Sequence, residues 1–263
     1  MIGAIIGDIV GSRFEFHNIK TKDFDLWHND CHTTDDTILT CAVADCLLHN
    51  GIVNNYLMKW GWMYKNQKYE DGKISAFSKG FTKWLDSGVA YNANTNGCIM
   101  RLSPVPLFYD NYNVGMNKAI DITNTTHNHP ESITATRAYI DTAYMIKKHI
   151  SVDNIKEHIS NKYDYDLYQS LDAVRPTYNK FYCTCKNSVP FALIAALDAT
   201  DFTDAIRGAI SIGGDSDTLA CMAGGIAELR FGVSSELCAQ SEKFMDSNMI
   251  KIVKEFYTKI KSN

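Results

Sequence analysis

Two short acidic stretches of the sequence contain the residue types that bind a divalent metal ion. The stretch "TTDDT" places Asp35 and Asp36 beside threonines, and "GGDSDT" does the same with Asp215 and Asp217. Carboxylate and hydroxyl oxygens are the ligands that Mg²⁺ and Mn²⁺ prefer, in shells close to octahedral geometry. If the two stretches meet in one cavity, they could form a two-metal centre with the ions about 3.5–4 Å apart.

Each stretch can also be interpreted as an ordinary helix cap. Thr33 and Asp36 have the spacing of a capping box, and a carboxylate stabilises a helix N-terminus by roughly 0.3–1 kcal/mol. Charge favours a metal site over capping alone. Converging carboxylates would repel one another, and no Lys or Arg lies within 23–58 or 208–229 to neutralise them locally. Divalent cations would supply the missing positive charge.

The N-terminal stretch "GAIIGDIVGSRFEF" adds two more carboxylates. Asp8 and Glu15 are seven positions apart, which places them on one face of a helix unless Gly11 and Ser12 end the helix between them. Taken separately, Asp8 is typical of a capping carboxylate and Glu15 of a solvated side chain.

Two glycine-containing stretches could approach a ligand through their backbone. In "NTNGCIMR", Asn96 and Gly97 precede a helical run whose amides could bind a phosphate, although a capped turn would have the same sequence. In "GGDSDT", Gly213 and Gly214 would admit a ligand next to the backbone, and Ser216 could donate its hydroxyl. A tight turn between helices is the alternative for this second stretch.

Histidines occur in two places that could suggest other metal sites. The stretch "TTHNHPES" contains His127 and His129, but an all-oxygen site would not recruit imidazoles, so polar loop residues are the expected role. The stretch "HNDCH" at 28–32 resembles half of a zinc site. No second ligand pair follows it at a zinc-finger spacing, so we do not expect zinc.

Helices must position these residues, because helical periodicity dominates and short alternating runs bounded by turns are scarce. The predicted class is therefore all-α. Turn signals agree, since Asn50 and Gly51 end one predicted helix, and Pro130 suits the first turn of another. We predict helices over roughly 2–11, 36–49, 54–65, 73–86, 97–108, 115–125, 130–149, 152–159, 164–174, 188–199, 202–213, 217–231, 235–244 and 247–261.

Two further segments complete the predicted organisation. The stretch 175–190 is expected to be one surface loop. The glycine-rich stretch "LACMAGGIAE" at 219–228 is expected to be helical. Each glycine costs up to about 1 kcal/mol in helix propensity, so these small residues need a packing or ligand reason.

Composition favours a single soluble globular domain over 1–263. The 263 residues are 45% hydrophobic and 21% charged with a net charge of −4, which indicates neither disorder nor a basic nucleic-acid surface. No apolar window suits a membrane span, and the N-terminus lacks the basic region of a signal peptide. We therefore expect a cytoplasmic monomer that binds neither membranes nor nucleic acid. The eight cysteines lack a C-x-x-C pair and are expected to be reduced, mostly buried thiols.

Five motifs in series give the sequence a resemblance to a known family. The motifs are "GAIIGDIVGSRFE", "TTDDT", "NGCIMRLSPVPL", "TTHNHPES" and "GGDSDTLACMAGGIA". In this order they resemble the ADP-ribosylglycohydrolases, which include dinitrogenase-reductase-activating glycohydrolases and ADP-ribosyl-acceptor hydrolases. The resemblance extends over about 2–230. It implies an all-α fold with a binuclear Mg²⁺ or Mn²⁺ centre at the base of a cleft.

The resemblance also implies roles for individual residues. Glu15 is similar to a glutamate that reaches the metal site or its bound water, and His127 to a histidine that lines the ribose or phosphate part of the cleft. The loop at Asn96 and Gly97 is similar to one that contacts the diphosphate, although Thr95 stands where glycine is frequent. By motif position, the implied metal ligands are Thr34, Asp35, Asp36, Asp215, Asp217 and Thr218.

The implied reaction is hydrolysis of the glycosidic bond between ADP-ribose and an acceptor side chain. Glu15 and Asp36 are the candidates for activating water or assisting the leaving group. Arginine-linked ADP-ribose on protein is the favoured substrate, and serine-linked or poly(ADP-ribose) the alternatives. Two other classes stay open: a non-catalytic ADP-ribose binder, and a di-metal hydrolase of the nucleotide pyrophosphate. The complete set of acidic positions disfavours the binder.

Overall fold

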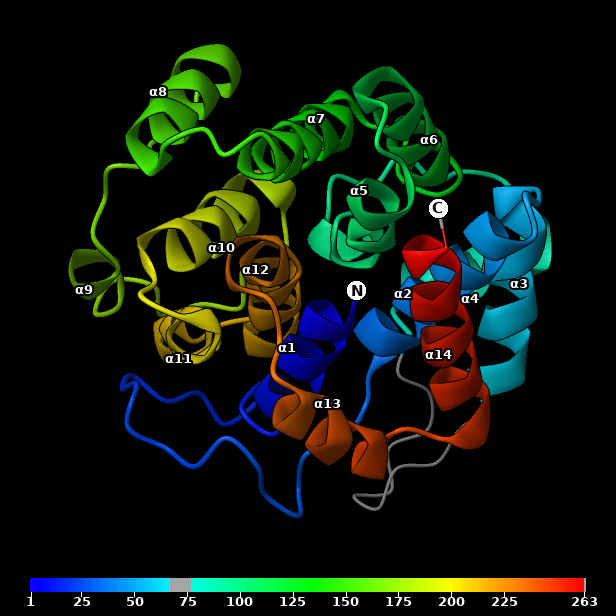
Figure 1. Ribbon diagram of the computed structural model, residues 1–263, viewed down its shortest axis with the longest axis horizontal. Helices are drawn as coiled ribbons and strands as arrows, with labels where there is room; N and C mark the ends of the chain where they lie inside the picture. Colours follow the sequence, from blue (N-terminus) through cyan, green and yellow to red (C-terminus); the bar gives the residue numbers. More distant parts are fainter. Residues whose placement is uncertain (67–76, 263) are drawn as a thin grey trace.

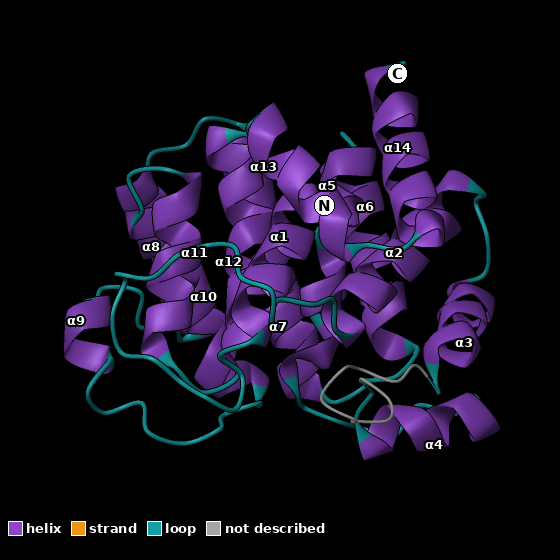
Figure 2. Cartoon of the chain, turned by 90° about the horizontal axis from the view of Figure 1, so that it is seen from below, coloured by secondary structure: helices purple, strands orange, loops and turns teal. Residues whose placement is uncertain are grey.

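Helices form the regular structure of the described residues, 1–66 and 77–262 of this computed structural model (Figure 1). No strand is present among these residues, and Thr95 and Thr184 form an isolated antiparallel bridge (Figure 2). This confirms the all-α prediction. The elements are α1 (Ile2–Ser12), α2 (Asp35–Leu48), α3 (Val53–Tyr64), α4 (Lys79–Ser87), η1 (Asn96–Cys98), η2 (Met100–Leu102), α5 (Pro104–Phe108), α6 (Tyr112–Asn124), α7 (Pro130–Lys147), α8 (Val152–Tyr163), α9 (Leu171–Val174), α10 (Cys185–Asp198), α11 (Phe202–Ile212), α12 (Ser216–Phe231), α13 (Ser235–Ser241), η3 (Glu242–Phe244) and α14 (Ser247–Lys261).

Two glycine-rich helices, α1 and α12, pack against each other in the core. Every residue of α1 is buried, and α12 is buried over most of its length. A Cβ atom added to Gly7 would lie 2.0 Å from the Ala220 carbonyl oxygen, and one on Gly224 would lie 2.1 Å from the Gly3 carbonyl oxygen. The backbones therefore approach too closely for any side chain at these positions. This close approach is the packing reason for Gly224, whereas a Cβ atom on Gly225 would lie 2.5 Å from the Tyr139 hydroxyl and 2.8 Å from Ser103 Cβ.

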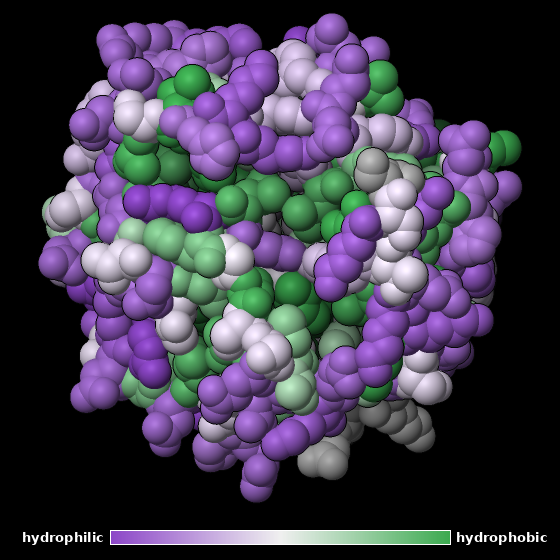
Figure 3. All heavy atoms as spheres, viewed as in Figure 1, coloured by the Kyte–Doolittle hydropathy of each residue, from purple (hydrophilic) through white to green (hydrophobic). Residues whose placement is uncertain are grey.

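The other helices surround this pair. α2 packs against α1 and is covered by α3 and α14. α10 and α11 pack on α12, and α7 packs on α10 and α12 (Figure 1). On the face shown in Figure 3, polar residues form the periphery and apolar residues gather near the middle. None of the helices in the described ranges is long and apolar enough to cross a membrane. All eight cysteines are free thiols, as predicted.

The prediction of one continuous helix over 97–108 is wrong. The segment is divided into η1, η2 and α5. Pro104 has no amide hydrogen, so it could not donate to the Met100 carbonyl as a continuous helix requires. That carbonyl instead accepts from Thr40 Oγ1 (3.4 Å) and Cys221 Sγ (3.3 Å).

Two predicted helices in the second half also have different limits. The helix predicted over 164–174 is reduced to the four residues of α9, because Asp164 adopts a left-handed conformation with φ 57° and ends α8. The helix predicted over 188–199 begins earlier, at Cys185. The loop predicted over 175–190 therefore ends before Cys185.

Three more boundaries differ from the prediction. The helix predicted over 73–86 falls partly outside the described residues, and α4 begins only after its cap, Ser78. The helix predicted over 115–125 starts earlier because the Asn111 side chain accepts from the Val114 amide and caps α6. The helix predicted over 235–244 divides into α13 and η3. The remaining predicted helices begin and end within four residues of the observed limits.

Candidate functional site

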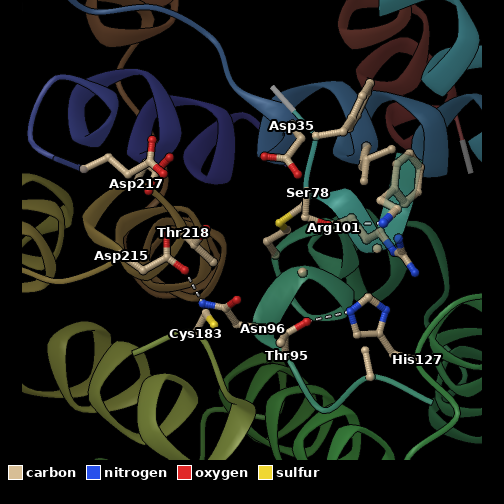
Figure 4. A pocket seen from close by; sticks show the side chains of 18 of the residues that line it. Asp35, Ser78, Thr95, Asn96, Arg101, His127, Cys183, Asp215, Asp217 and Thr218 are labelled. Atoms are coloured by element: carbon tan, nitrogen blue, oxygen red, sulfur yellow. Dashed lines mark hydrogen bonds between the residues drawn. The ribbon is translucent and has the colours of Figure 1, made fainter. Parts of the chain in front are cut away.

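Carboxylates from α1, α2, α12 and the loop after α1 converge on one region. This acidic cluster consists of Asp8, Glu15, Asp35, Asp36, Asp215 and Asp217. One oxygen from each of Asp8, Asp36 and Asp217 lies within 4.8 Å of the other two, and Glu15, Asp215 and Asp217 form a second such group. Asp217 belongs to both groups. The two acidic stretches of the sequence therefore meet in space (Figure 4).

Asp8 caps the N-terminus of α2. Its Oδ2 accepts the amides of Thr34 (2.9 Å) and Thr37 (3.0 Å), together with the Thr37 hydroxyl, and its Oδ1 accepts from Thr34 Oγ1 (2.7 Å). Thr34, and not Thr33, is the N-cap residue, and its hydroxyl accepts from the Asp36 amide at 3.3 Å. Capping of α2 therefore does not exclude metal binding by the same stretch. The Asp8 carboxylate of α1 accepts two of the backbone amides at the N-terminus of α2.

Two buried carboxylate oxygens of the cluster have no hydrogen-bond donor among the described residues. Asp36 Oδ2 accepts from Thr34 Oγ1 (3.2 Å) and Thr218 Oγ1 (3.1 Å), but Asp36 Oδ1 has no donor. The same is true of Asp217 Oδ1. Leaving a buried polar atom unsatisfied costs about 1–3 kcal/mol, and more when the group is charged. These two oxygens therefore require a proton or a cation.

Burial raises the pKa of every aspartate in the cluster. For Asp35, Asp36 and Asp217 the pKa lies well above the ordinary value, because neighbouring carboxylates reinforce the effect of burial. The pKa values of Asp8 and Asp215 are also raised, mainly by burial. The cluster therefore binds positive charge, as protons or cations, more readily than exposed carboxylates do.

The donor atoms of the cluster fit hard divalent cations. The two groups of ligand atoms contain only carboxylate oxygens, with neither Cys nor His. Within 1–66 and 77–262, no Lys or Arg forms an ion pair with Asp8, Asp36, Asp215 or Asp217. Mg²⁺ and Mn²⁺ prefer such oxygen ligands and would neutralise the buried charge.

The turn before α12 positions Asp215. Gly213 and Gly214 have φ angles of 79° and 71°, which only glycine adopts without strain. Asn18 closes the turn, since its Oδ1 accepts the Gly214 amide (2.8 Å) and its Nδ2 donates to the Gly214 carbonyl (2.9 Å). Asn96 Nδ2 then donates to Asp215 Oδ2 at 2.7 Å. Asp215 is thus positioned both by the turn before α12 and by the hydrogen bond from Asn96.

Three residues expected to bind substrate do not line the cavity that opens beside the acidic cluster. They are Gly213, Gly214 and Ser216. The two glycines form the tight turn that the sequence left as an alternative, and the buried Ser216 hydroxyl donates to the Gly11 carbonyl at 3.3 Å. Their role in the structure is to shape the chain beside Asp215.

A cavity of about 440 Å³ opens beside the acidic cluster, within the range of small-molecule sites. Glu15, Asp35, Asp217 and Thr218 line its acidic end, where the Asp35 carboxylate points into the space opposite Asp217 (Figure 4). Asp36 is buried and does not line the cavity. Of the two residues expected to act chemically, only Glu15 can therefore touch a bound molecule directly.

Away from the acidic end, the cavity is lined by the basic Arg101, by His127 and by Tyr91, whose ring centroid lies 5.2 Å from that of His127. Asn96, Gly97 and His127, predicted from the sequence to bind substrate, all line the cavity, and Figure 4 shows His127 on the side away from Asp217. Burial, aided by the charge of Arg101, lowers the pKa of His127 to about 3. His129 does not line the cavity and instead caps α7, where it accepts from the amide two residues later at 3.1 Å.

Sequence reasoning did not identify Arg101 as a site residue. It is completely buried, and its Nη2 donates to the Ile122 carbonyl (3.1 Å) and to Thr126 Oγ1 (2.6 Å). Its Nε and Nη1 have no acceptor in the described residues. A charged residue inside the apolar run "CIMRLSP" was the available signal, because such residues are rarely buried without a partner.

Comparisons with known proteins identify the family and the fold of the chain. A protein-family model described as ADP-ribosylglycohydrolase matches residues 1–239. A protein of Acanthamoeba polyphaga mimivirus, named as an ADP-ribosyl glycohydrolase, is 26% identical over 278 residues, and the alignment covers 86% of this chain and 84% of that protein. A solved structure described as an ADP-ribosylglycohydrolase-related protein complex matches with a TM-score of 0.71 and 17% identity, covering 98% of this chain and 95% of that one. At this identity the structural match shows a shared fold.

Proposed function

The chain belongs to the ADP-ribosylglycohydrolase family, and we propose that it is a metal-dependent hydrolase that releases ADP-ribose from an acceptor on an ADP-ribosylated protein. One observation carries the proposal. Carboxylates from α2, from the start of α12 and from the loop after α1 line one end of a cavity that is also lined by Arg101, His127 and Tyr91. A ribose beside bound cations and an anionic diphosphate farther along would match this polarity.

The proposed metal ligands are Thr34, Asp35, Asp36, Asp215, Asp217 and Thr218. When bound, two Mg²⁺ or Mn²⁺ ions would orient the ribose and activate water at neutral pH. Both oxygens of Asp8 already accept hydrogen bonds from α2. We therefore assign Asp8 the role of orienting Thr34 and the start of α2, as residues behind metal ligands commonly do.

Glu15 is the proposed catalytic acid–base residue. It lines the cavity, and one of its oxygens lies within 4.8 Å of oxygens of Asp215 and Asp217. From there it could exchange a proton with the attacking water or with the leaving group, which typically contributes about 10²–10⁴-fold in rate. Positive charge that develops on the ribose would be stabilised by the Asp35 carboxylate facing the cavity.

Arginine-linked ADP-ribose is the favoured substrate. The guanidinium of such an acceptor is positively charged, and the acidic end of the cavity would attract it. Serine-linked and poly(ADP-ribose) are the alternatives, because their sugar and diphosphate would make the same contacts. A cytoplasmic location, a monomeric state, and the absence of nucleic-acid binding also stay predictions.

Product analysis tests the proposed reaction. Peptides with ADP-ribose on arginine or serine are incubated with the protein and Mg²⁺ or Mn²⁺, and we expect free ADP-ribose. AMP together with ribose phosphate would instead identify a pyrophosphohydrolase, and binding without any product would identify a binder.

The variant Asp217→Asn tests the metal centre in the same assay. It preserves the side-chain shape but removes the carboxylate shared by both groups of ligand atoms. We expect the metal-dependent rate to fall by at least about a hundredfold, with the circular dichroism spectrum unchanged. Asp23→Asn, an exposed carboxylate on the loop after α1, is the matched control. Activity of Asp217→Asn near that of the control would exclude the metal centre.

A further inference from the structure

A chain of hydrogen bonds leads from the buried Arg101 to the wall of the cavity. Arg101 Nη2 lies 2.6 Å from Thr126 Oγ1, which lies 2.6 Å from His127 Nδ1. On the other side of the imidazole, His127 Nε2 lies 2.9 Å from Thr95 Oγ1 (Figure 4). Thr126 is buried, whereas Thr95 lines the cavity.

The direction of each hydrogen bond in this chain, which we call the relay, follows from the guanidinium of Arg101 and from the need of each buried hydrogen for an acceptor. A guanidinium can only donate, so Thr126 Oγ1 accepts from Arg101. The one other contact recorded for the Thr126 hydroxyl is His127 Nδ1. Thr126 is completely buried, and leaving its hydroxyl hydrogen without an acceptor would cost about 1–3 kcal/mol. His127 Nδ1 is therefore assigned as the acceptor of this hydrogen. A neutral imidazole that accepts at Nδ1 carries its proton on Nε2 and donates it to Thr95 Oγ1.

Burial and the charge of Arg101 keep this imidazole neutral, since they lower the pKa of His127 to about 3. Each hydrogen bond of the relay therefore keeps the same donor and acceptor throughout the neutral pH range. The Thr95 hydroxyl accepts from His127, and its own hydrogen has no acceptor recorded within the described residues. Because Thr95 lines the cavity, this hydrogen is available to a molecule bound there.

The Thr95 side chain is not needed to hold its own loop. Backbone bonds on both sides of the Thr95–Thr184 bridge already fix the segment, from the Asn96 amide to the Cys183 carbonyl (2.8 Å) and from the Cys185 amide to the Asn94 carbonyl (2.8 Å). The Thr95 hydroxyl is therefore available to donate a hydrogen bond to a bound molecule.

We propose that Thr95 is a specificity-determining donor for an anionic group of the substrate, and that Arg101, Thr126 and His127 aim its hydroxyl into the cavity. If the proposed function holds, on which this assignment of the ligand rests, the anion is the diphosphate of ADP-ribose. Arg101, Thr126 and His127 act as positioning residues, and Thr95 makes the contact.

Calorimetric titration with ADP-ribose tests the donor. Thr95→Val keeps the shape of the side chain but removes the hydroxyl, and we expect affinity to fall about tenfold to a hundredfold, the effect of one hydrogen bond to a charged group. Thr95→Ser should restore binding. Affinity for adenosine, which has no phosphate, should not change. Equal affinity of Thr95→Val and wild type for ADP-ribose would overturn the proposal.

A double-mutant comparison tests the relay itself. Thr126→Val should weaken ADP-ribose binding although Thr126 does not line the cavity, and Thr126→Ser should restore it. The double variant with Thr95→Val should bind no more weakly than Thr95→Val alone, whereas additive losses would refute the relay. Thr123→Val is the matched control, because this buried threonine at the same end of α6 bonds to Thr136 at 2.7 Å instead.

Two further measurements separate this inference from the proposed function. Nitrogen-15 NMR of the imidazole at neutral pH should show a neutral His127 with its proton on Nε2, and a proton on Nδ1 would refute the direction of the relay. If the wild type does not bind ADP-ribose, the proposed function fails. Inorganic pyrophosphate then replaces ADP-ribose as the titrant, and the donor survives only if Thr95→Val weakens pyrophosphate binding.

Discussion

Asp217 contributes oxygens to both groups of the acidic cluster, and burial together with the charges of Glu15 and Asp215 raises its pKa. A carboxyl group whose pKa is raised by folding is destabilised in its charged form. At neutral pH the cluster therefore opposes folding until cations or protons neutralise it. The cluster therefore does not stabilise the fold by itself.

Glu15→Gln tests the chemical role of the one glutamate in this cluster. The amide keeps the size of the side chain but cannot exchange a proton, so we expect turnover to fall about 10²–10⁴-fold. Affinity for ADP-ribose should change little. Single-turnover kinetics and calorimetry measure the two quantities, with the exposed Glu157→Gln on α8 as control. A loss of affinity without a loss of rate would assign Glu15 to binding alone.

At the scale of elements, the packing of α1 on α12 sets the distance between Asp8 and Asp217. These helices approach so closely because glycines face backbone atoms across the interface. The division of the segment 97–108 into η1, η2 and α5 also positions residues that line the cavity. It places Asn96 and Arg101 on short turns beside the cavity instead of on one straight helix. Both features follow from residues that disfavour regular helices.

Gly7→Ala tests whether this close packing builds the metal site. The new Cβ would lie 2.0 Å from the Ala220 carbonyl oxygen, so the helices must separate. We expect a loss of about 2–3 kcal/mol in the free energy of unfolding, together with weaker Mn²⁺ binding as Asp8 and Asp217 move apart. Urea unfolding and calorimetry measure these effects.

Gly208→Ala provides the comparison for this prediction. It lies inside α11, where a Cβ would meet only side-chain atoms, the nearest at 3.3 Å. We expect it to leave stability and Mn²⁺ binding nearly unchanged. If Gly7→Ala behaved in the same way, the helix spacing would not control the site.

At the scale of the whole molecule, Asp141 of α7 joins three helices away from the site. It accepts hydrogen bonds from Tyr112 of α6 (2.6 Å) and Lys162 of α8 (2.8 Å), among others. Burial alone would raise the pKa of Asp141, but four side-chain donors outweigh burial and hold it below its ordinary value. These donors are Lys162, Tyr112, Tyr163 and His158.

Asp141→Asn should therefore lower global stability in a pH-dependent way. A depressed carboxyl pKa contributes stability above the pKa of the unfolded chain, and that contribution is lost as pH falls through the folded pKa. We expect a loss of about 2 kcal/mol at pH 7, with a smaller difference from wild type in acid below the ordinary aspartate pKa. Urea unfolding at several pH values measures it, with Asp23→Asn as control. A difference independent of pH would show that charge is not the cause.

The sequence by itself determined the all-α class, most helix positions and the family. These depend on hydrophobic period, turn residues and motif order, which are properties of neighbouring residues along the chain. It also identified Asp35, Asp36, Asp215 and Asp217 as a possible metal site, because their types and their lack of nearby basic residues are visible without coordinates.

Only the tertiary structure decided which residues from separate segments contact one another. In the folded chain, Asp8 caps α2, and Gly213 and Gly214 form a turn. Arg101 and Thr95 lie at the two ends of one chain of hydrogen bonds. Each of these roles depends on a contact between segments that are separate in sequence. Local patterns carry no information about such contacts, because helix packing fixes the distance and the direction of each side chain.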